Sequence, residues 1–406
     1  MRRLKLLLIA PGCDRAAVGE GGISFQLVSR IGLRHDVTVL VSRHSTRLPI
    51  APQLPDMEVI EWPDPPLFER WQQFNSMLKP GYVTFYSRAR KWLQQYLRSG
   101  RNFDLAHQIM PLALRYPSPA TGLGLPLLIG PVGGSVDTPK SFSSDANKVP
   151  WYTQLRRFDE WRLRYDPLLR RTYAKADCVI AVAPYVKEIL GNIPSHEVEI
   201  MTETGVASLP AVRDASTEKG HPWKFLFVGR VIRSKGVRDA IRAFAQLRDW
   251  SEWTFEIVGD GADLAQCKEE ARNLGVSERV IFHGRLPRNE VDAFYERADV
   301  FLFPSFREPS GAVVVEAMSY GLAMIVADRG GPASVVDDHC GLRVPVKDPE
   351  QFARDIAAAI RELATQPARI LAMGSAAREK IRRDFLWDAK VDHLEKIYCR
   401  VLNEKM

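Results

Sequence analysis

The feature that most constrains the fold is a repeated alternation of apolar runs, glycine-containing loops and amphipathic stretches. Near the amino end, the apolar run 4–10 is followed by the glycine loop 19–22, a helix-like stretch (ISFQLVSRIGL) and a second apolar run, 35–42. A strand, a glycine loop, a helix and a second strand form a βαβ unit, and such units build a parallel, doubly wound sheet. The amino-terminal sequence therefore predicts an α/β fold.

The same alternation restarts in the second half of the chain. Further strands of the first half are expected at four apolar runs: 105–108, 126–130, 178–183 and 198–202. Residues 207–222 are polar and contain Pro and Gly, which is typical of a linker. Five more strands then alternate with helices, beginning with WKFLFVGR and VRDAIRAFAQLR. This pattern predicts two Rossmann-like domains with a cleft between them, one over 1–210 and one over 222–384.

The positive charge of the chain is concentrated in its first half. The 406 residues include 56 Lys and Arg and 49 Asp and Glu, so the net charge is +7. Residues 1–211 hold 26 basic and 19 acidic residues, and the remainder is neutral. Such asymmetry bears on partners rather than on fold. A solvated basic face without a role is the alternative.

Several classes of protein are disfavoured because their motifs are absent from the sequence. There is no P-loop, no G-x-S-x-G, no H-E-x-x-H, no D-x-D and no G-x-G-x-x-G after the first strand. Five scattered cysteines without a C-x-x-C pair fit a reducing cytoplasm. The apolar part of MRRLKLLLIAPGC is too short for a secretion signal, and no run is long enough to span a membrane. The sequence therefore favours a cytoplasmic protein without a metal or cofactor.

Basic residues follow the first strand of the second domain, where ligands of open α/β sheets bind. Gly229 and Arg230 stand at the strand end, and Lys235 precedes a helix. An Arg and a Lys beside a helix N-terminus can neutralise a diphosphate without a metal ion. The alternative is an ordinary solvated loop.

Two carboxylates follow the strand VFLFPS. Glu308 lies in the loop and Glu316 on the helix that begins near Ser310, and the free backbone amides of Gly311 and Ala312 point to the same side. Carboxylates beside an apolar helix need hydrogen-bond donors, and sugar and ribose hydroxyls are suitable donors. Alternatively, Glu308 caps the helix and Glu316 pairs with an Arg.

Together these segments resemble the donor-binding domain of the family 4 retaining glycosyltransferases. The resemblance rests on Gly229-Arg230, Lys235-Gly236, Gly259-Asp260-Gly261, FHGRLP, ADVFLFPSFREPSGAVVVEAMSYG and ADRGGPASVVDD, in this order and spacing. In the first domain, Gly21-Gly22, FDLAHQ, IGPVGG and ETGV are also similar to that family. The match is strongest over residues 223–345 and weaker over 50–100 and 138–175.

The resemblance implies a GT-B fold, with two facing domains and a helix over 385–406 that returns to the first domain. It implies that 1–210 binds the acceptor and 222–384 a nucleotide-sugar donor, and that transfer retains the anomeric configuration without a metal. Implied catalytic residues are His107, Arg230, Lys235 and Glu308. Implied donor-binding residues are Gly21, Gly22, Gly229, Arg230, Lys235, Gly284, Arg285, Leu286, Glu308, Ser310, Gly311, Ala312, Val313 and Glu316.

Two of these implied roles need comment. His107 would approach the sugar from the first domain, and a buried histidine at a strand end is the alternative. The sequence departs from many relatives at Pro309-Ser310, where they have Gly-Phe. Because the spacing is unchanged, we expect this difference to affect the choice of sugar more than activity.

The acceptor and the cellular location are suggested by two basic segments. Residues 70–101 contain seven Arg and Lys, no acidic residue and seven aromatic residues, and 156–175 contain seven basic and three acidic residues. Basic and aromatic segments suit anionic membranes and lipid-diphosphate carriers, and they also suit nucleic acid or an anionic polysaccharide. Buried aromatic faces of two helices are the alternative.

We therefore expect a UDP- or GDP-sugar donor, a glycan or polyprenyl-diphosphate-linked acceptor, no nucleic acid, and peripheral contact with the cytoplasmic membrane face. A nucleotide-sugar epimerase and a non-catalytic nucleotide-sugar-binding subunit are the alternative functions.

Overall fold

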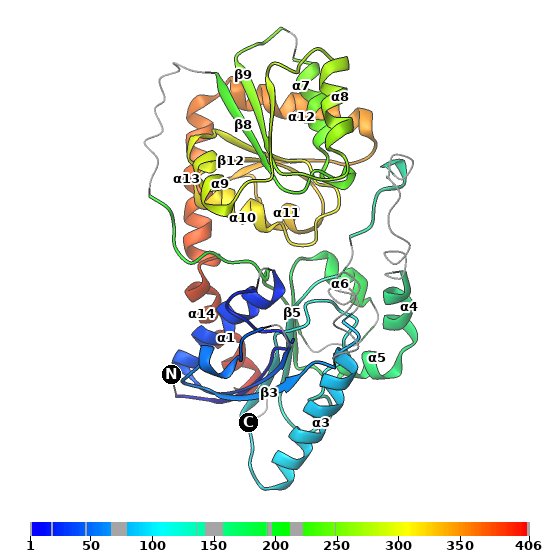
Figure 1. Cartoon of the computed structure of the whole chain (residues 1–406), viewed down its shortest axis with the longest axis vertical. Helices are drawn as coiled ribbons and strands as arrows, with labels where there is room; N and C mark the ends of the chain where they lie inside the picture. The colour runs from blue at the N-terminus through cyan, green and yellow to red at the C-terminus, as the bar shows by residue number, and fades with distance from the viewer. Residues whose placement is uncertain are drawn as a thin grey trace. The chain divides into compact units, whose positions relative to one another are not determined.

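The structure is a computed structural model in which the chain forms two compact units. One comprises Met1–Gly134, Pro150–Glu203 and Trp387–Met406, and the other comprises Ser135–Val149 and Thr204–Leu386. The residues that the structure describes are 2–17, 19–44, 47–65, 79–134, 136–142, 157–191, 193, 197–211, 222–247 and 249–403. The elements of both units are labelled in Figure 1.

The first unit contains a seven-stranded sheet in the order β3-β2-β1-β4-β5-β6-β7, and every adjacent pair is parallel. The strands are β1 (Lys5–Ile9), β2 (Asp36–Arg43), β3 (Glu58–Pro63), β4 (Leu105–Gln108), β5 (Leu127–Val132), β6 (Cys178–Ala181) and β7 (Val198–Ile200). The helices of this unit are α1 (Glu20–Arg34), α3 (Tyr82–Arg98), α4 (Arg157–Tyr165), α5 (Pro167–Ala174), α6 (Tyr185–Leu190) and α14 (Trp387–Asn403).

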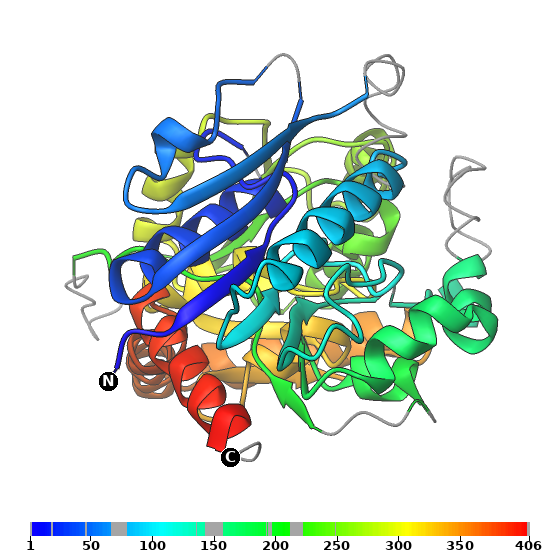
Figure 2. The ribbon, with the colours of Figure 1, turned by 90° about the horizontal axis from the view of Figure 1, so that it is seen from below.

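Strand β1 is apolar after its exposed first residue, Lys5, because both faces of the strand are covered. Leu7 and Ile9 pack into a core that includes residues of α3, and Leu6 and Leu8 pack into a core that includes residues of α1 and α14. Figure 2 shows this arrangement, with α3 in cyan and α14 in red on either side of the blue strands. The helix expected over 385–406 is observed as α14, Trp387–Asn403, and belongs to the first unit, whereas residues 385–386 belong to the second.

The second unit contains a six-stranded parallel sheet in the order β10-β9-β8-β11-β12-β13. Its strands are β8 (Trp223–Val228), β9 (Trp253–Val258), β10 (Val280–Gly284), β11 (Val300–Phe303), β12 (Ala323–Ala327) and β13 (Gly341–Val344). Its helices are α7 (Val237–Ala245), α8 (Leu264–Asn273), α9 (Arg288–Arg297), α10 (Ala312–Ser319), α11 (Gly330–Val335), α12 (Pro349–Ala364) and α13 (Pro367–Asp384).

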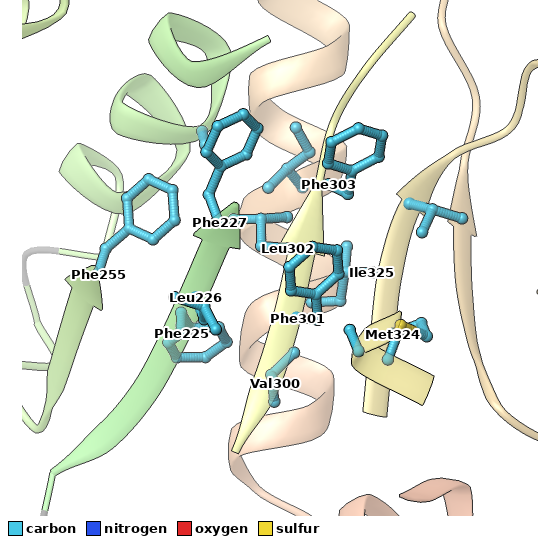
Figure 3. Close-up of a cluster of buried hydrophobic side chains, with 14 of the residues drawn as sticks. Phe225, Leu226, Phe227, Phe255, Val300, Phe301, Leu302, Phe303, Met324 and Ile325 are labelled. Carbon is cyan, nitrogen blue, oxygen red and sulfur yellow. The ribbon is translucent and has the colours of Figure 1, made fainter. Parts of the chain in front are cut away.

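Aromatic residues of β8 and β11 form the centre of the second core (Figure 3). The rings of Phe227 and Phe303 stack at 5.7 Å, and those of Phe301 and Phe303 at 5.9 Å. Each is buried to 1% exposure or less, which stabilises the unit by about 1.5–3 kcal/mol per side chain. The strands that carry these rings, β8 and β11, end at the loops that hold the candidate site residues.

Residues 136–142 correct the domain boundaries expected from the sequence. They follow β5, which belongs to the first unit, yet they cluster with the second unit. The physical reason is Phe142, which is fully buried and whose ring lies 4.4 Å from that of Phe306 and 6.2 Å from that of Phe352. The second unit also begins earlier than expected, at Thr204. Most of the expected linker, 207–222, lies outside the described residues.

Candidate functional site

The loops that carry the expected donor-binding residues flank one point of the second sheet. The strand order reverses between β8 and β11, and ligands of open α/β sheets bind outside the carboxyl ends of the strands at such a point. Arg230 and Lys235 follow β8, and Glu308 follows β11. The structure therefore brings these three residues to the same edge of the sheet.

Lys235 and Glu308 form an ion pair although they are 73 residues apart in the sequence. Their side chains retain only 10% and 15% exposure, so both charges are largely removed from water. The Lys235 ammonium also lies 5.4 Å from the centre of the Phe303 ring. Two partly buried charges that neutralise each other can exchange that partner for the opposite charges of a ligand.

Glu308 has a second contact at the start of α10. Its Oε1 accepts a hydrogen bond from the backbone N–H of Gly311 at 3.3 Å. Gly311 has a left-handed backbone (φ 79°) and precedes the first helical residue, Ala312. The amides of Ala312 and Val313 have no acceptor within the helix, because the first N–H groups of a helix never do. Glu308 thus both caps α10 and pairs with Lys235.

Two glycines that the sequence analysis left without a role support this loop. A Cβ atom on Gly330 would lie 2.1 Å from the carbonyl oxygen of Glu308, and one on Gly331 would lie 2.4 Å from the Cα of Ser310. The N–H of Gly331 donates to the Glu308 carbonyl at 3.0 Å. Only glycine allows α11 to approach the loop so closely. The two consecutive glycines within ADRGGPASVVDD were the sequence signal for this close contact.

Glu316 lies on α10 and is held by two residues of α9. The Arg288 guanidinium contacts one carboxylate oxygen at 2.7 Å, and the Tyr295 hydroxyl donates to the other at 3.2 Å. The expected alternative, pairing with an Arg, is therefore present. An ionised carboxylate can accept further hydrogen bonds on both oxygens, so these contacts orient Glu316 without saturating it.

The remaining expected donor-binding residues of this unit lie on neighbouring strand ends. Arg230 is exposed. A Cβ atom on Gly259 would lie 1.8 Å from the carbonyl oxygen of Gly229, so the loops after β8 and β9 pack backbone to backbone. Gly284 ends β10 with a left-handed backbone (φ 71°), Arg285 is exposed and Leu286 is half-buried.

Arg233 is a further residue of this edge that the sequence analysis did not single out. Its guanidinium pairs with the fully buried Asp239 at 2.5 Å and lies 5.3 Å from the ring centres of both Phe142 and Phe306. Burial raises the pKa of Asp239 above its usual range, against the opposing effect of Arg233. Arg233 therefore anchors the loop that presents Lys235. The sequence signal that could have identified Arg233 is its place in the segment RSKG, shortly after a strand.

His107 is fully buried at the end of β4. Its Nε2 lies 2.7 Å from the carbonyl oxygen of Gly130, and its Nδ1 lies 2.7 Å from the hydroxyl of Tyr398. A carbonyl only accepts, so Nε2 carries the proton and Nδ1 accepts from Tyr398. Burial lowers the pKa of His107 to about 4. Since both nitrogens are engaged, this geometry supports the buried strand-end histidine rather than contact with a sugar.

Gly21 and Gly22 lie in the first turn of α1 and not in a loop before it, which corrects the expected helix start. A Cβ atom on Gly21 would lie 2.5 Å from the carbonyl oxygen of Gly12, and one on Gly22 would lie 2.3 Å from that of Ala17. These glycines let the loop after β1 fold back over the N-terminus of the helix.

The basic segment 70–101 is explained by packing where the structure describes it. Tyr82 and Phe85 on α3 are buried in the first unit, and Tyr86, Trp92 and Tyr96 pack against the same core. Residues 70–78 lie outside the described residues. The segment around 156–175 differs, because Trp161 on α4 and Tyr165 at its end are 59% and 56% exposed.

Two further observations concern metals and membranes. Within the described ranges, no group of three or more His, Cys, Asp or Glu side chains is arranged to hold a metal ion. No described helix is long and apolar enough to cross a membrane.

The comparison with family models decides the family. The model for glycosyl transferases group 1 matches residues 210–379, and the model for glycosyltransferase family 4 matches residues 26–202. The chain belongs to the family 4 glycosyltransferases. The candidate donor-site residues of the second unit, Arg230, Lys235, Glu308 and Glu316, lie in the segment matched by the group 1 model.

Curated relatives of this family are similar over part of their length. A glycogen synthase of Mycobacterium tuberculosis is 28% identical over 233 residues, which is 57% of this chain and 55% of the relative. A 2-deoxystreptamine glucosyltransferase of Streptomyces kanamyceticus is 35% identical over 39% of this chain and 41% of its own length. A D-inositol 3-phosphate glycosyltransferase of Corynebacterium aurimucosum is 34% identical over 44% and 43%. The chain thus spans about half the length of the curated relatives it matches, or less.

Solved structures share the fold over nearly the whole chain. A sucrose-phosphate synthase from Thermosynechococcus elongatus superposes with a TM-score of 0.65 at 20% identity and covers 99% of this chain and 100% of its own. Anabaena Alr3699/HepE in complex with UDP gives 0.64 at 16% identity and 98% and 100% coverage. The lipopolysaccharide outer core galactosyltransferase WaaB gives 0.62 at 17% identity and 99% and 100% coverage. The fold expected from the resemblance is confirmed.

Proposed function

We propose that this protein transfers a sugar, with retention of configuration and without a metal ion, from a UDP- or GDP-sugar to a glycan or lipid-linked acceptor. The observation that carries the proposal is the Lys235–Glu308 pair beside the N-terminus of α10, at the point where the strand order reverses. The family to which the chain belongs supports the reaction class.

Donor binding would exchange the partners of this ion pair. The Lys235 ammonium would turn to the diphosphate, and the Glu308 carboxylate would accept hydroxyls of the transferred sugar. Lys235 then stays paired with a negative charge and Glu308 stays hydrogen-bonded, so neither charge is left without a partner in a partly buried site. Because Glu308 is held by the Gly311 amide, its carboxylate is already oriented before the sugar arrives.

The departing diphosphate gains negative charge as the anomeric bond breaks. Lys235, the exposed Arg230 and the first amides of α10 would stabilise that charge from fixed positions, which is the kind of electrostatic effect that contributes most in many enzymes. These groups can supply the positive charge that a metal ion supplies elsewhere. This is the physical basis of the proposed metal independence.

The nucleoside would lie toward α9 and β10. Glu316 would accept the ribose hydroxyls in the orientation set by Arg288 and Tyr295. The backbone around Gly284 and Leu286 would lie beside the base. The structure of Alr3699/HepE is a complex with UDP, which supports UDP-sugars as the first donors to test.

The proposal is tested by thermal unfolding with UDP-, GDP-, ADP- and dTDP-sugars in the absence of divalent metal. A ligand that binds only the folded protein stabilises it by about 2.7 kcal/mol at 100 times its Kd. We expect one nucleotide class to stabilise the wild type and Lys235→Ala to bind it at least about tenfold more weakly, because hydrogen bonds to charged groups contribute about 1.5–3 kcal/mol.

Lys268→Ala is the matched control, because Lys268 is an exposed lysine of the same unit on α8. It should bind the donor like the wild type. Equal donor affinity of Lys235→Ala and Lys268→Ala would contradict the diphosphate assignment. Release of the nucleoside diphosphate distinguishes transfer or hydrolysis from a non-catalytic binding subunit, and a changed sugar on an intact nucleotide would indicate an epimerase.

We also propose peripheral contact with an anionic membrane through α4 and α5. Trp161, Tyr165 and Leu168 are 59%, 56% and 42% exposed. The rings of Trp161 and Tyr165 lie 5.6 Å apart, and the Arg164 guanidinium lies 5.5 Å from the Tyr165 ring centre. Exposed aromatic residues next to arginines suit the boundary between lipid headgroups and acyl chains.

A further inference from the structure

The first sheet has a reversal point of its own, which the proposed donor site does not use. Its strand order reverses between β1 and β4, and the carboxyl ends of the strands at such a point are where open α/β sheets commonly bind ligands. The loop after β4 contains Arg115 and Tyr116, and Gln108 is the last residue of β4. All three residues belong to the first unit.

These three side chains hold buried polar atoms that have no hydrogen-bond partner. The atoms are the Gln108 Oε1, the Arg115 Nε and Nη1, and the Tyr116 hydroxyl, and their residues are 1%, 9% and 6% exposed. The great majority of buried polar groups in proteins are hydrogen-bonded. Several orphaned groups on neighbouring residues therefore indicate a missing partner at this place.

Contacts link the three residues into one cluster. The Tyr82 and Tyr116 rings lie 4.8 Å apart, and the Arg115 guanidinium lies 6.0 Å from the centre of the Tyr116 ring. The Gln108 side chain hydrogen-bonds the Tyr82 hydroxyl, which itself donates to the Pro117 carbonyl. Tyr82 thus joins Gln108 to Tyr116 and Arg115.

Arg115 is held in place by a carboxylate of α4. Its Nη2 contacts Asp159 at 2.8 Å, and its side chain keeps 10% exposure. The pair fixes the guanidinium and leaves the Nε and Nη1 donors unused. Arg115 keeps this exposure, whereas Tyr116 packs in the core of the first unit.

The free groups define the chemistry of the missing partner. The Arg115 nitrogens and the Tyr116 hydroxyl offer donors beside a guanidinium that is paired with Asp159 on one side, and Gln108 offers one acceptor. Arg90 is close to the same loop, since its Nη1 donates to the carbonyls of Pro119 and Thr121. Several donors around a cation match an anionic group, and one acceptor matches a hydroxyl beside it.

We infer that Gln108, Arg115 and Tyr116 form an acceptor subsite that binds a phosphate or carboxylate group next to a sugar hydroxyl. The inference rests on the proposed glycosyltransferase function, because it assigns the bound anion to the acceptor. It narrows the acceptor to sugars that carry a negative charge, either on a phosphate link to a carrier or on the ring as a uronate.

The subsite is tested in the Lys235→Ala protein, in which the proposed diphosphate contact is removed. The probes are inorganic phosphate, glucuronate and glucose, with thermal unfolding as the readout. We expect phosphate or glucuronate to stabilise the protein and glucose to have little effect. Stabilisation by phosphate alone indicates a phosphate-linked acceptor, and stabilisation by glucuronate indicates a uronate. Equal stabilisation by glucose, or none by either anion, would overturn the inference.

Variants then locate the binding. Adding Arg115→Gln should weaken anion binding at least tenfold, and Arg101→Gln, which changes an exposed arginine of the same unit, should leave it unchanged. Tyr116→Phe keeps the ring and the Arg115–Asp159 pair and should weaken binding severalfold, so the test does not depend on one variant folding.

Donor binding by the wild type and by Arg115→Gln in the wild-type background is measured in parallel. Loss of anion binding with donor binding unchanged supports the subsite. Anion binding that survives both Arg115→Gln and Tyr116→Phe overturns the subsite, whatever the donor experiment shows.

Discussion

His107 illustrates how burial decides the role of a single residue. Its ring has no exposed surface, and it joins β4 to β5 through Gly130 and to α14 through Tyr398. The same side chain in an open strand end would be a candidate for contact with a substrate. Enclosed by these partners, it is a neutral group that holds three elements together, because burial disfavours its charged form.

This burial predicts loss of stability in acid. The pKa of His107 is about 4 in the folded protein, below its unfolded value near 6.5, so the unfolded chain binds the proton more readily. The contribution of His107 is present above pH 6.5 and is lost as the pH falls toward 4, by up to about 3 kcal/mol. We expect Tm to fall less between pH 7 and pH 4.5 in His107→Gln than in the wild type. His339→Gln, at an exposed position, is the control, and equal pH dependence of His107→Gln and the wild type would contradict the assignment.

At the scale of elements, the short stretch 136–142 contributes to the core of the second unit through one side chain. Phe142 is fully buried against Phe306 and Phe352, and Arg233 lies over its ring. The neighbouring Lys235 belongs to the same loop as Arg233. The packing of Phe142 therefore supports both the core and the loop that carries the proposed donor contact.

Phe142→Ala should destabilise the second unit by about 3–5 kcal/mol, the usual cost of removing a buried aromatic ring. Phe142→Leu keeps most of the apolar volume and should cost clearly less. Denaturant unfolding and donor affinity are the measurements, and we expect Phe142→Ala to weaken donor binding as well. A cost below about 1 kcal/mol for Phe142→Ala would show that the ring packs loosely.

At the scale of the whole molecule, the net charge of +7 lies entirely within residues 1–211. The exposed aromatic residues Trp161 and Tyr165 lie on α4 and the exposed Leu168 lies on α5, whereas the described aromatic residues of α3 are in the core or packed against it. Basic residues and exposed apolar side chains thus occur together on this pair of helices. This coincidence favours α4 and α5, and not the segment 70–101, as the membrane contact.

We expect the protein to co-sediment with vesicles of phosphatidylcholine and phosphatidylglycerol but only weakly with phosphatidylcholine alone. Each basic residue near an anionic surface contributes about 1 kcal/mol, and salt screens this attraction. The double variant Trp161→Ala and Tyr165→Ala should bind at least about tenfold more weakly, since burial of exposed apolar surface is lost. Leu33→Ala, at a 72% exposed position on α1, is the control. Equal binding to both kinds of vesicle would contradict the proposal.

Much of the architecture could be predicted because its signals are local. Apolar runs and glycine loops indicated most strands of both sheets within a few residues. Strand β3 was missed because its sequence, EVIEWP, contains two Glu and a Pro at the edge of the sheet, where its residues are only half-buried or exposed. The start of α1 was misplaced because glycine usually marks a loop, whereas here close packing against Gly12 and Ala17 requires it.

The sequence by itself determined the α/β class, the two-part organisation and the segments that supply the candidate site, because strand periodicity and strand-end motifs depend on neighbouring residues. Only the tertiary structure decided that Lys235 pairs with Glu308, that Arg288 holds Glu316, and that Phe142 packs in the second core. It also decided that His107 is enclosed and that Arg115 keeps unused donors. These outcomes depend on which distant segments meet and how much water they exclude, and no local pattern carries that information.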